Sequence, residues 1–221
     1  MLDSTVPFKI SDIRHAYSFI KSLDGRKLVY IYLKNNKLCS LVFYITGYNL
    51  LHLTGLSYYN KFDKPGRFIK DLKRKRINID QLGEKDDGST RLKLVVLPLL
   101  EYIVYPGVKV SDNRIVLDGH SFRSSLYVRK SLNMRSAIML GEDCKNMSQR
   151  YLFPESLYNY DSIGSETRKK IGNTCRVLAL FSPSERDSKL KFMSVYFISE
   201  QPGFTSDDIL NFMSQANKKL Q

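Results

Sequence analysis

The sequence predicts an α+β fold with N-terminal helices and an early β-hairpin. An antiparallel β-sheet packed on a central apolar helix follows, and then a C-terminal helix. Three observations support this class: apolar residues recur at helical spacing near both ends, two β-rich segments flank a turn at residues 35–37, and short extended runs follow residue 106. Helices followed by consecutive strands are typical of α+β proteins.

The first helix is expected over residues 9–22, KISDIRHAYSFIKS, behind a Ser11 or Asp12 cap. Its apolar side would be formed by Ile10, Ile13, Tyr17 and Ile20. The segments KLVYIYLKN and KLCSLVFYITG, on either side of an Asn-Asn-Lys turn, then predict a β-hairpin over residues 27–47. The stretch NLLHLTGL, residues 49–56, is expected to end the second strand and enter a turn.

The middle of the chain predicts two further helices. Residues 63–76, DKPGRFIKDLKRKR, place Phe68, Ile69 and Leu72 on one side of a helix that is otherwise basic. A polar loop is expected at residues 81–90, and a buried central helix at about 90–105, with Ser89 or Thr90 as its cap. Pro98 within this helix predicts a kink or an early end.

The rest of the chain predicts strands and a last helix. Each strand candidate is bounded by turn-forming residues, and together they are residues 113–119, 124–131, 136–142, 149–156, 174–183 and 189–199. Short connections between consecutive strands favour antiparallel pairing. The final helix is expected over residues 205–220, with Ile209, Leu210, Phe212 and Met213 packing inward. We expect residues 1–221 to form a single domain, since typical domains hold roughly 100 to 200 residues.

The composition indicates a globular protein with an anionic partner. Hydrophobic residues make up 43% of the chain and charged residues 26%, while the formal net charge of +13 exceeds what solubility requires. Such an excess indicates nucleic acid or a membrane surface as partner. The widely spaced cysteines, Cys39, Cys144 and Cys175, indicate neither a disulfide framework nor a zinc knuckle, and favour a reducing compartment.

Two further features predict a cytoplasmic protein. The N-terminal segment lacks the long apolar region of a signal peptide. The most apolar window, residues 92–110, is interrupted by charged residues and prolines and falls short of the ~20 clean residues that cross a bilayer.

The motifs of several enzyme classes are missing from the sequence. It contains no dinucleotide-binding, P-loop, zinc-protease, serine-hydrolase or EF-hand motif. Its three histidines have no neighbouring acidic cluster that would suggest a metal site. We therefore expect no cofactor and no metal, and any catalysis is expected to be metal-independent.

Residues 61–76 hold eight lysines or arginines and two aspartates. A helix of this charge can follow a phosphate backbone without reading its sequence, or it can be a solvated face. The nucleic-acid-binding candidates are Arg67, Lys70, Lys73, Arg74, Lys75 and Arg76.

Each histidine has a structural and a functional interpretation. His52 can be a strand-end residue that satisfies a backbone group, or a group for acid-base chemistry. His120, with Ser121 and Arg123 beside it, competes for the same role or is an exposed loop residue. His15 is the weakest candidate because it lies on a helix among apolar neighbours.

Several segments occur in a characteristic order: YNLLHLTGL after a strand, a basic helix beginning FDKPGRF, then RLKLVVLPLLEYI, NRIVLDG, AIMLGE and YLFPESLYNYD. In this order the chain resembles the fourth of the phage barnase, EndoU, colicin and RelE-like (BECR-fold) nuclease families of phages and mobile elements. The resemblance covers about residues 24–200. It implies N-terminal helices followed by a four-stranded antiparallel sheet, and a metal-independent ribonuclease activity.

Members of the wider superfamily cleave RNA by attack of the 2′-hydroxyl on the adjacent phosphate, which needs a base, an acid and cationic donors. Position by position, the resemblance implies His52 as general acid or base, Thr54 as a phosphate-binding or ring-orienting hydroxyl, and Gly55 as a site of close backbone approach. Lys93 is either aimed at the site or a snorkelling lysine. Arg123 and Ser156 are further candidates for phosphate contact.

Two functions stay open at the level of sequence. One is an endoribonuclease that acts as a toxin or effector, with RNA preferred over DNA and an immunity protein as a potential partner. The other is a non-enzymatic protein that binds nucleic acid or a host nucleoprotein complex, for example to counter a defence system. Membrane binding is disfavoured because the basic helix lacks the wide apolar face that insertion needs.

Overall fold

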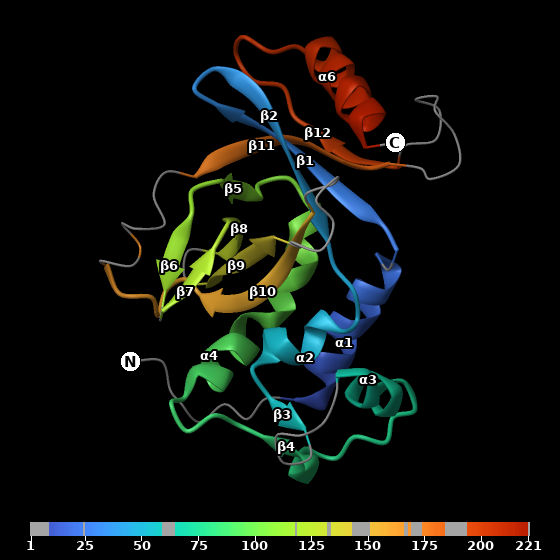
Figure 1. The fold of residues 1–221 in the computed structure, drawn as a ribbon, viewed down its shortest axis with the longest axis vertical. Helices are drawn as coiled ribbons and strands as arrows, with labels where there is room; N and C mark the ends of the chain where they lie inside the picture. Colours follow the sequence, from blue (N-terminus) through green and yellow to red (C-terminus); the bar gives the residue numbers. More distant parts are fainter. Residues whose placement is uncertain are drawn as a thin grey trace.

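The computed structural model describes residues 9–23, 25–58, 65–117, 119–131, 134–142, 151–165, 168, 174–183 and 194–220. Figure 1 shows most of the helices gathered at one end of a large sheet, with α6 at the other. The helical elements are α1 (Ile10–Ser22), α2 (Asn49–Thr54), α3 (Pro65–Lys73), η1 (Ile79–Gln81), α4 (Ser89–Val96), η2 (Leu97–Val104) and α6 (Ser206–Lys219).

A closed sheet forms the centre of the described structure. Its strands are β1 (Lys27–Lys34), β2 (Lys37–Tyr44), β5 (Lys109–Ser111), β8 (Ser124–Ser131), β9 (Met134–Glu142), β10 (Leu152–Asn159), β11 (Cys175–Ser182) and β12 (Ser194–Ile198). Seven of these described strands close into a barrel in the order β1-β2-β10-β9-β8-β5-β11, because β11 pairs with β1, and β12 adds to β11. The α+β class is confirmed, but the sheet is larger than the four-stranded sheet that the resemblance implies.

The early hairpin is part of this barrel. Its turn residues Asn35 and Asn36 have φ angles of 49° and 56°, as a two-residue hairpin turn requires. β1 pairs with β11, and β2 meets β10 in a parallel contact between Phe43 and Leu152. The hairpin and the later strands therefore form one sheet, so the expected arrangement of a hairpin followed by an antiparallel sheet is only partly confirmed. The physical reason is that β1 is apolar on both faces and needs cover on each.

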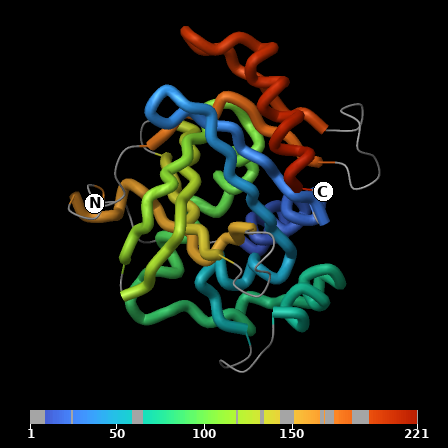
Figure 2. Tube along the Cα trace, turned by 45° about the horizontal axis from the view of Figure 1, so that its top comes forward, coloured from blue at the N-terminus to red at the C-terminus, as the bar shows by residue number. Residues whose placement is uncertain are grey.

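Two hydrophobic clusters lie on the two faces of β1. Leu28 and Tyr30 point into the main core, which α1 and η2 share with the barrel interior. Val29 and Ile31 point to the other face, where Ile209 and Met213 of α6 cover them. Figure 2 shows α6 running beside the hairpin and the strands of the C-terminal part.

The C-terminal helix matches its prediction except at one residue. The Thr205 side chain accepts a hydrogen bond from the backbone N–H of Asp208, which caps the helix. Ile209 and Met213 are buried as expected, but Leu210 is 38% exposed. The four residues expected to face inward span more of the helix circumference than the sheet covers.

The expected central helix consists of two elements. α4 ends at Val96, and Pro98 stands in the first turn of the 3₁₀ helix η2, so the predicted early end at Pro98 is confirmed. η2 is the buried part. Leu92 and Val95 of α4 are exposed, so the expectation of a helix buried on nearly all sides was wrong for its first half.

Smaller elements complete the described structure. α3 buries Phe68, Ile69 and Leu72 as expected. β3 (Ser57–Tyr58) pairs with β4 (Leu82–Gly83), so part of the expected polar loop is ordered by strand pairing, and β6 (Ile115–Leu117) pairs with β7 (His120–Phe122). None of the described helices is both long and apolar enough to cross a membrane.

Candidate active site

His52 lies on a short helix and not in a turn. α2 buries Leu50, Leu51 and Leu53 and leaves His52 exposed on the opposite side. Gly55 ends the helix in the left-handed conformation, with φ 71°, and its N–H bonds to the carbonyl of His52. The expectation of a strand end and turn was wrong. The leucines of this short segment fit a strand as well as a single helical turn, so the pattern does not distinguish the two.

The absence of a side chain at Gly55 leaves room for Lys93 of α4 to pack against the end of this helix. A Cβ atom built on Gly55 would come within 3.0 Å of Lys93 Cδ, so a larger residue would displace the lysine. The hydroxyl of Thr90, one turn earlier on α4, donates to the Gly55 carbonyl at 2.9 Å. This hydrogen bond joins α4 to the end of α2. The group that approaches the Gly55 backbone closely is the protein's own Lys93 side chain.

The Lys93 side chain is directed at β10. Its Nζ donates to the Ser156 hydroxyl oxygen at 3.0 Å and lies 5.9 Å from the centre of the Tyr158 ring. Lys93 is half-buried, and burial and the charge of Lys85 lower its pKa. Ser156 is itself buried, so it positions the lysine.

An irregularity in β10 brings the main chain to His52. Pro154 pairs with Leu140 and Ser156 with Met139, which leaves Glu155 as an extra residue between them. Such bulges re-aim side chains and are over-represented near active sites. The Glu155 side chain lies over Gly141, where a Cβ would come within 2.1 Å of Glu155 Oε1.

Hydrogen bonds join α2 to this bulge. The ring of His52 is hydrogen-bonded to the backbone of Glu155. The Asn49 side-chain amide donates to the Pro154 carbonyl at 3.5 Å, and its oxygen accepts from the backbone N–H of Thr46 at 2.8 Å. The position of His52 is therefore set from the strand as well as from the helix.

The electrostatic surroundings favour a neutral His52. Partial removal of water by the protein is the largest cause that lowers its pKa, and the charges of Lys93 and then Lys85 lower it further. The hydrogen bond to the Glu155 backbone acts in the opposite direction, and the nearby His120 adds a smaller lowering. Burial raises the pKa of Glu155, whereas the charge of His120 lowers it.

The structure thus brings Lys93 and Ser156 to the helix that carries His52, and the charge of His120 acts on both His52 and Glu155. Glu155 completes the group and was missed from the sequence. The signal that could have found it is Pro154, since proline inside a strand is confined to edges and bulges.

Thr54 lies elsewhere than expected. Its side chain is fully buried, and its hydroxyl donates to the Leu51 carbonyl at 2.7 Å and accepts from the Leu56 N–H at 3.2 Å. A hydroxyl held in this way closes the end of α2. It does not reach the surface at which His52 is exposed, so phosphate binding by Thr54 finds no support in this geometry.

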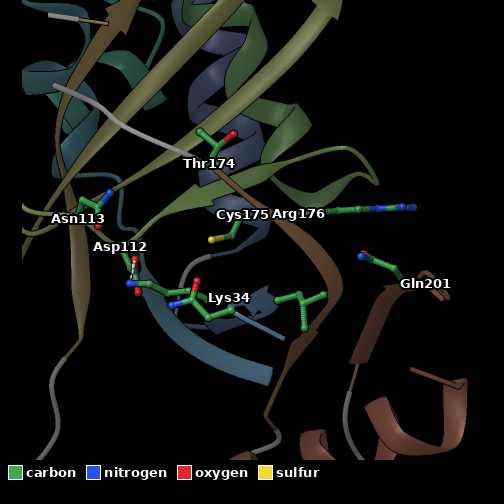
Figure 3. A pocket seen from close by; sticks show the side chains of 9 residues that line it. Lys34, Asp112, Asn113, Thr174, Cys175, Arg176 and Gln201 are labelled. Carbon is green, nitrogen blue, oxygen red and sulfur yellow. Dashed lines mark hydrogen bonds and ion pairs between the residues drawn. The ribbon is translucent and has the colours of Figure 1, made fainter. Parts of the chain in front are cut away.

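Arg123 is directed away from this group. Its guanidinium donates to the Asp112 carbonyl at 3.3 Å. Asp112 lines a pocket of about 340 Å³, where its carboxylate accepts from Lys34 Nζ at 2.7 Å. Figure 3 shows this pair facing each other beside Cys175, while Arg176 extends away from it. Arg123 therefore lies near this pocket and not beside His52.

A hollow adjoins Lys93. It measures about 270 Å³, and its lining includes Leu92, Lys93, Leu157, Tyr158 and Ile163. The hollow has an aromatic wall and a cationic edge, which are features that suit part of a nucleotide.

The basic helix lies against the other end of α2. The residues that expose their side chains there are Arg67, Lys70, Lys73, Arg74, Lys75 and Arg76. Arg67 is 3.9 Å from Asp71, whose carboxylate also accepts from Tyr58. Residues 61–64, counted in the basic stretch, lie outside the described residues.

Within the ranges that the structure describes, no three or more aspartate, glutamate, cysteine or histidine side chains come together in a way that could hold a metal ion. Cys144 lies outside those ranges.

Comparisons with known proteins identify the family of the chain. Residues 12–199 match the family described as phage-Barnase-EndoU-ColicinE5/D-RelE like nuclease4, which agrees with the resemblance seen in the segment order. Searches of the curated proteins and of the solved structures found no match. The family match spans most of the chain, including α2, α4 and β10. The chain belongs to the phage-Barnase-EndoU-ColicinE5/D-RelE like nuclease4 family.

Proposed function

We propose that this nuclease is a metal-independent endoribonuclease that cleaves RNA by attack of the 2′-hydroxyl on the adjacent phosphate. The observation that carries the proposal is the packing of Lys93 against the end of the helix that carries His52: a Cβ on Gly55 would lie 3.0 Å from Lys93 Cδ, and Lys93 Nζ donates to Ser156 beside the bulge of β10. His52, Lys93 and His120 also interact electrostatically, since Lys93 and, less strongly, His120 lower the pKa of His52. They supply the base, the cation and the acid that this reaction needs.

A residue of the site can be assigned to each step of this reaction. His52, held in its neutral form, takes the proton of the 2′-hydroxyl as the oxygen bonds to phosphorus. The bond from phosphorus to the 5′-oxygen then breaks, and the leaving oxygen takes a proton from His120. The Lys93 ammonium group stabilises the negative charge of the pentavalent intermediate, and Ser156 holds Lys93 in place. The products are a 2′,3′-cyclic phosphate and a 5′-hydroxyl.

The exposed cations of α3 support a nucleic acid as the substrate class. α3 lies beside the helix that carries His52, so a polyanion bound along α3 can reach the site. A nuclease of this kind would act on cytoplasmic RNA of a host, as a toxin or effector, and an immunity protein would then be its natural inhibitor.

The same basic surface favours a second candidate function. A protein that binds nucleic acid or a host nucleoprotein complex without cleavage needs the cations of α3 and does not need His52. Variants tested in cells distinguish the two functions. If the double substitution Lys70→Glu and Lys73→Glu abolishes the phenotype and His52→Ala does not, binding is the function.

The enzymatic proposal is tested with purified protein and a panel of tRNA, rRNA, mRNA and single-stranded DNA in EDTA. We expect cleavage of RNA and not of DNA, and a rate for His52→Ala that is lower by about a hundred-fold or more. His15→Ala is the matched control, because His15 is an exposed histidine paired with Glu101 and is not among the groups that alter the pKa of His52. Intact RNA throughout the panel, or equal cleavage by His52→Ala, would overturn the proposal.

A further inference from the structure

Tyr48 is an aromatic side chain left open to solvent beside the candidate active site. Its side chain is 65% exposed, although large apolar rings are usually buried in a core. Its backbone is already helical, with φ −64° and ψ −24°, directly before α2. Residues four apart on a helix lie on the same side, so the Tyr48 ring stands one turn from His52 on the exposed surface.

The ring of Tyr48 also touches the basic helix. A Cβ built on Gly66 of α3 would lie 3.4 Å from Tyr48 Cε1. Gly66 has no side chain to cover the ring, and its backbone does not need glycine for a positive φ. Arg67 and Lys70 follow on α3 with exposed side chains. The aromatic surface therefore lies between His52 and a row of cations.

Alternation of aromatic faces and cations is how proteins hold single-stranded nucleic acid. Bases stack on aromatic rings while lysine and arginine contact the phosphates, and the stacking tolerates any base because every base has a flat face. Bases inside a duplex are already stacked on one another and cannot use such a ring. A ring at this place therefore selects for an unpaired nucleotide.

We infer that Tyr48 is the stacking platform for an unpaired nucleobase next to the scissile phosphate, and that the substrate is single-stranded RNA running from Lys93 across His52 and Tyr48 onto α3. This inference rests on the proposed function, because it places the scissile phosphate at His52. It assigns Tyr48 to substrate binding and leaves the proton transfers to the histidines.

The test compares three substitutions at Tyr48 by steady-state kinetics on a single-stranded RNA oligonucleotide. Tyr48→Ala removes the ring and is expected to raise KM roughly ten-fold with kcat little changed. Tyr48→Phe and Tyr48→Trp keep an aromatic face and are expected to stay within about two-fold of the wild type. The matched control is Tyr105→Ala, which removes a ring that is 53% exposed at the end of η2 remote from Lys93.

A binding measurement separates this inference from the proposed function. The His52→Ala protein, with and without Tyr48→Ala, is titrated with an RNA that carries 2-aminopurine, whose fluorescence falls on stacking. Quenching that requires Tyr48 and disappears when a complementary strand is annealed supports the platform, even if the protein cleaves no RNA. Equal KM for Tyr48→Ala and Tyr105→Ala, or equal quenching with and without Tyr48, would overturn the platform while cleavage by the wild type still stood.

Discussion

The Nζ atom of Lys93 lies 3.0 Å from the Oγ atom of Ser156, across 63 positions of the chain. This hydrogen bond joins α4 to β10, and α2 with His52 lies against both elements. A lysine from a largely apolar helix thereby lies against the end of the helix that carries His52. The proposed chemistry depends on this arrangement, and the first two of the following predictions test it.

The first prediction concerns the pKa of His52. A base must be unprotonated to act, so a lowered pKa moves the acid limb of the pH-rate profile below the value of about 6.5 for an ordinary histidine. Lys93→Met removes a charge that lowers this pKa, so the His52 pKa should rise and the limb should move to higher pH. NMR titration of the His52 ring measures this shift directly.

The control for this titration is Lys218→Met, which removes an equal charge from α6 at the other end of the structure. It should leave the His52 titration unchanged. An unaltered His52 pKa in Lys93→Met would show that the two groups do not interact.

The second prediction concerns Gly55. Alanine at a left-handed position costs roughly 1–2 kcal/mol of stability, and at Gly55 its Cβ would also press on Lys93. Gly55→Ala should therefore lower kcat by about ten- to a hundred-fold as well as stability, because a small displacement of a reacting group is costly. Thermal unfolding and cleavage rates are measured on the same samples.

Gly25→Ala is the matched control, since Gly25 has a φ of 77° and nothing within 4 Å of the added Cβ. It should lose similar stability and keep its kcat. If both variants keep their activity, Lys93 does not need the space that Gly55 leaves.

The third prediction concerns the buried hydroxyl of Thr54. Thr54→Val leaves the Leu51 carbonyl and the Leu56 N–H without their partner and should destabilise the fold by roughly 1–3 kcal/mol. Thr54→Ser keeps the hydroxyl and should cost about 1 kcal/mol. At a temperature where each protein is folded, both should cleave with the wild-type kcat. A stable Thr54→Val protein without activity would instead place the hydroxyl in the reaction.

The fourth prediction concerns the cations of α3. Replacing Lys70 and Lys73 by glutamine should weaken RNA binding and reduce its salt dependence, by about 0.7 in the log-log slope for each phosphate that the protein no longer neutralises. Replacing Lys218 and Lys219 of α6 removes the same charge from a helix remote from His52. Equal slopes for the two double variants would mean that α3 is only a solvated face.

Much of the fold could be predicted from local patterns. The two asparagines at residues 35 and 36 marked the hairpin turn, and Pro98 marked the end of α4. The closure of the barrel could not be predicted in the same way, because the pairing of β1 with β11 joins residues such as Val29 and Phe181. Apolar periodicity shows that a strand needs cover on both faces, but not which distant strand supplies it.

The residues of the candidate site could likewise be predicted only in part from the sequence. His52 stood out as a histidine in a recognisable segment, and Lys93 as a charge in an apolar helix. Thr54 was expected beside the substrate because the resemblance places it in the same motif as His52, but on a helix a spacing of two residues turns its side chain into the core. Glu155 was missed although Pro154, a proline inside a predicted strand, indicates a bulge at this position.

The most direct test of the central claim is to map the ends of the cleaved RNA in EDTA, and then to replace the 2′-hydroxyl at the mapped position by hydrogen. The account predicts 2′,3′-cyclic phosphate and 5′-hydroxyl ends, loss of cleavage at the deoxy position, and loss of cleavage at every position in His52→Ala. Cleavage of the deoxy bond at an equal rate, leaving 3′-hydroxyl and 5′-phosphate ends, would contradict it, because water and not the ribose would then be the nucleophile.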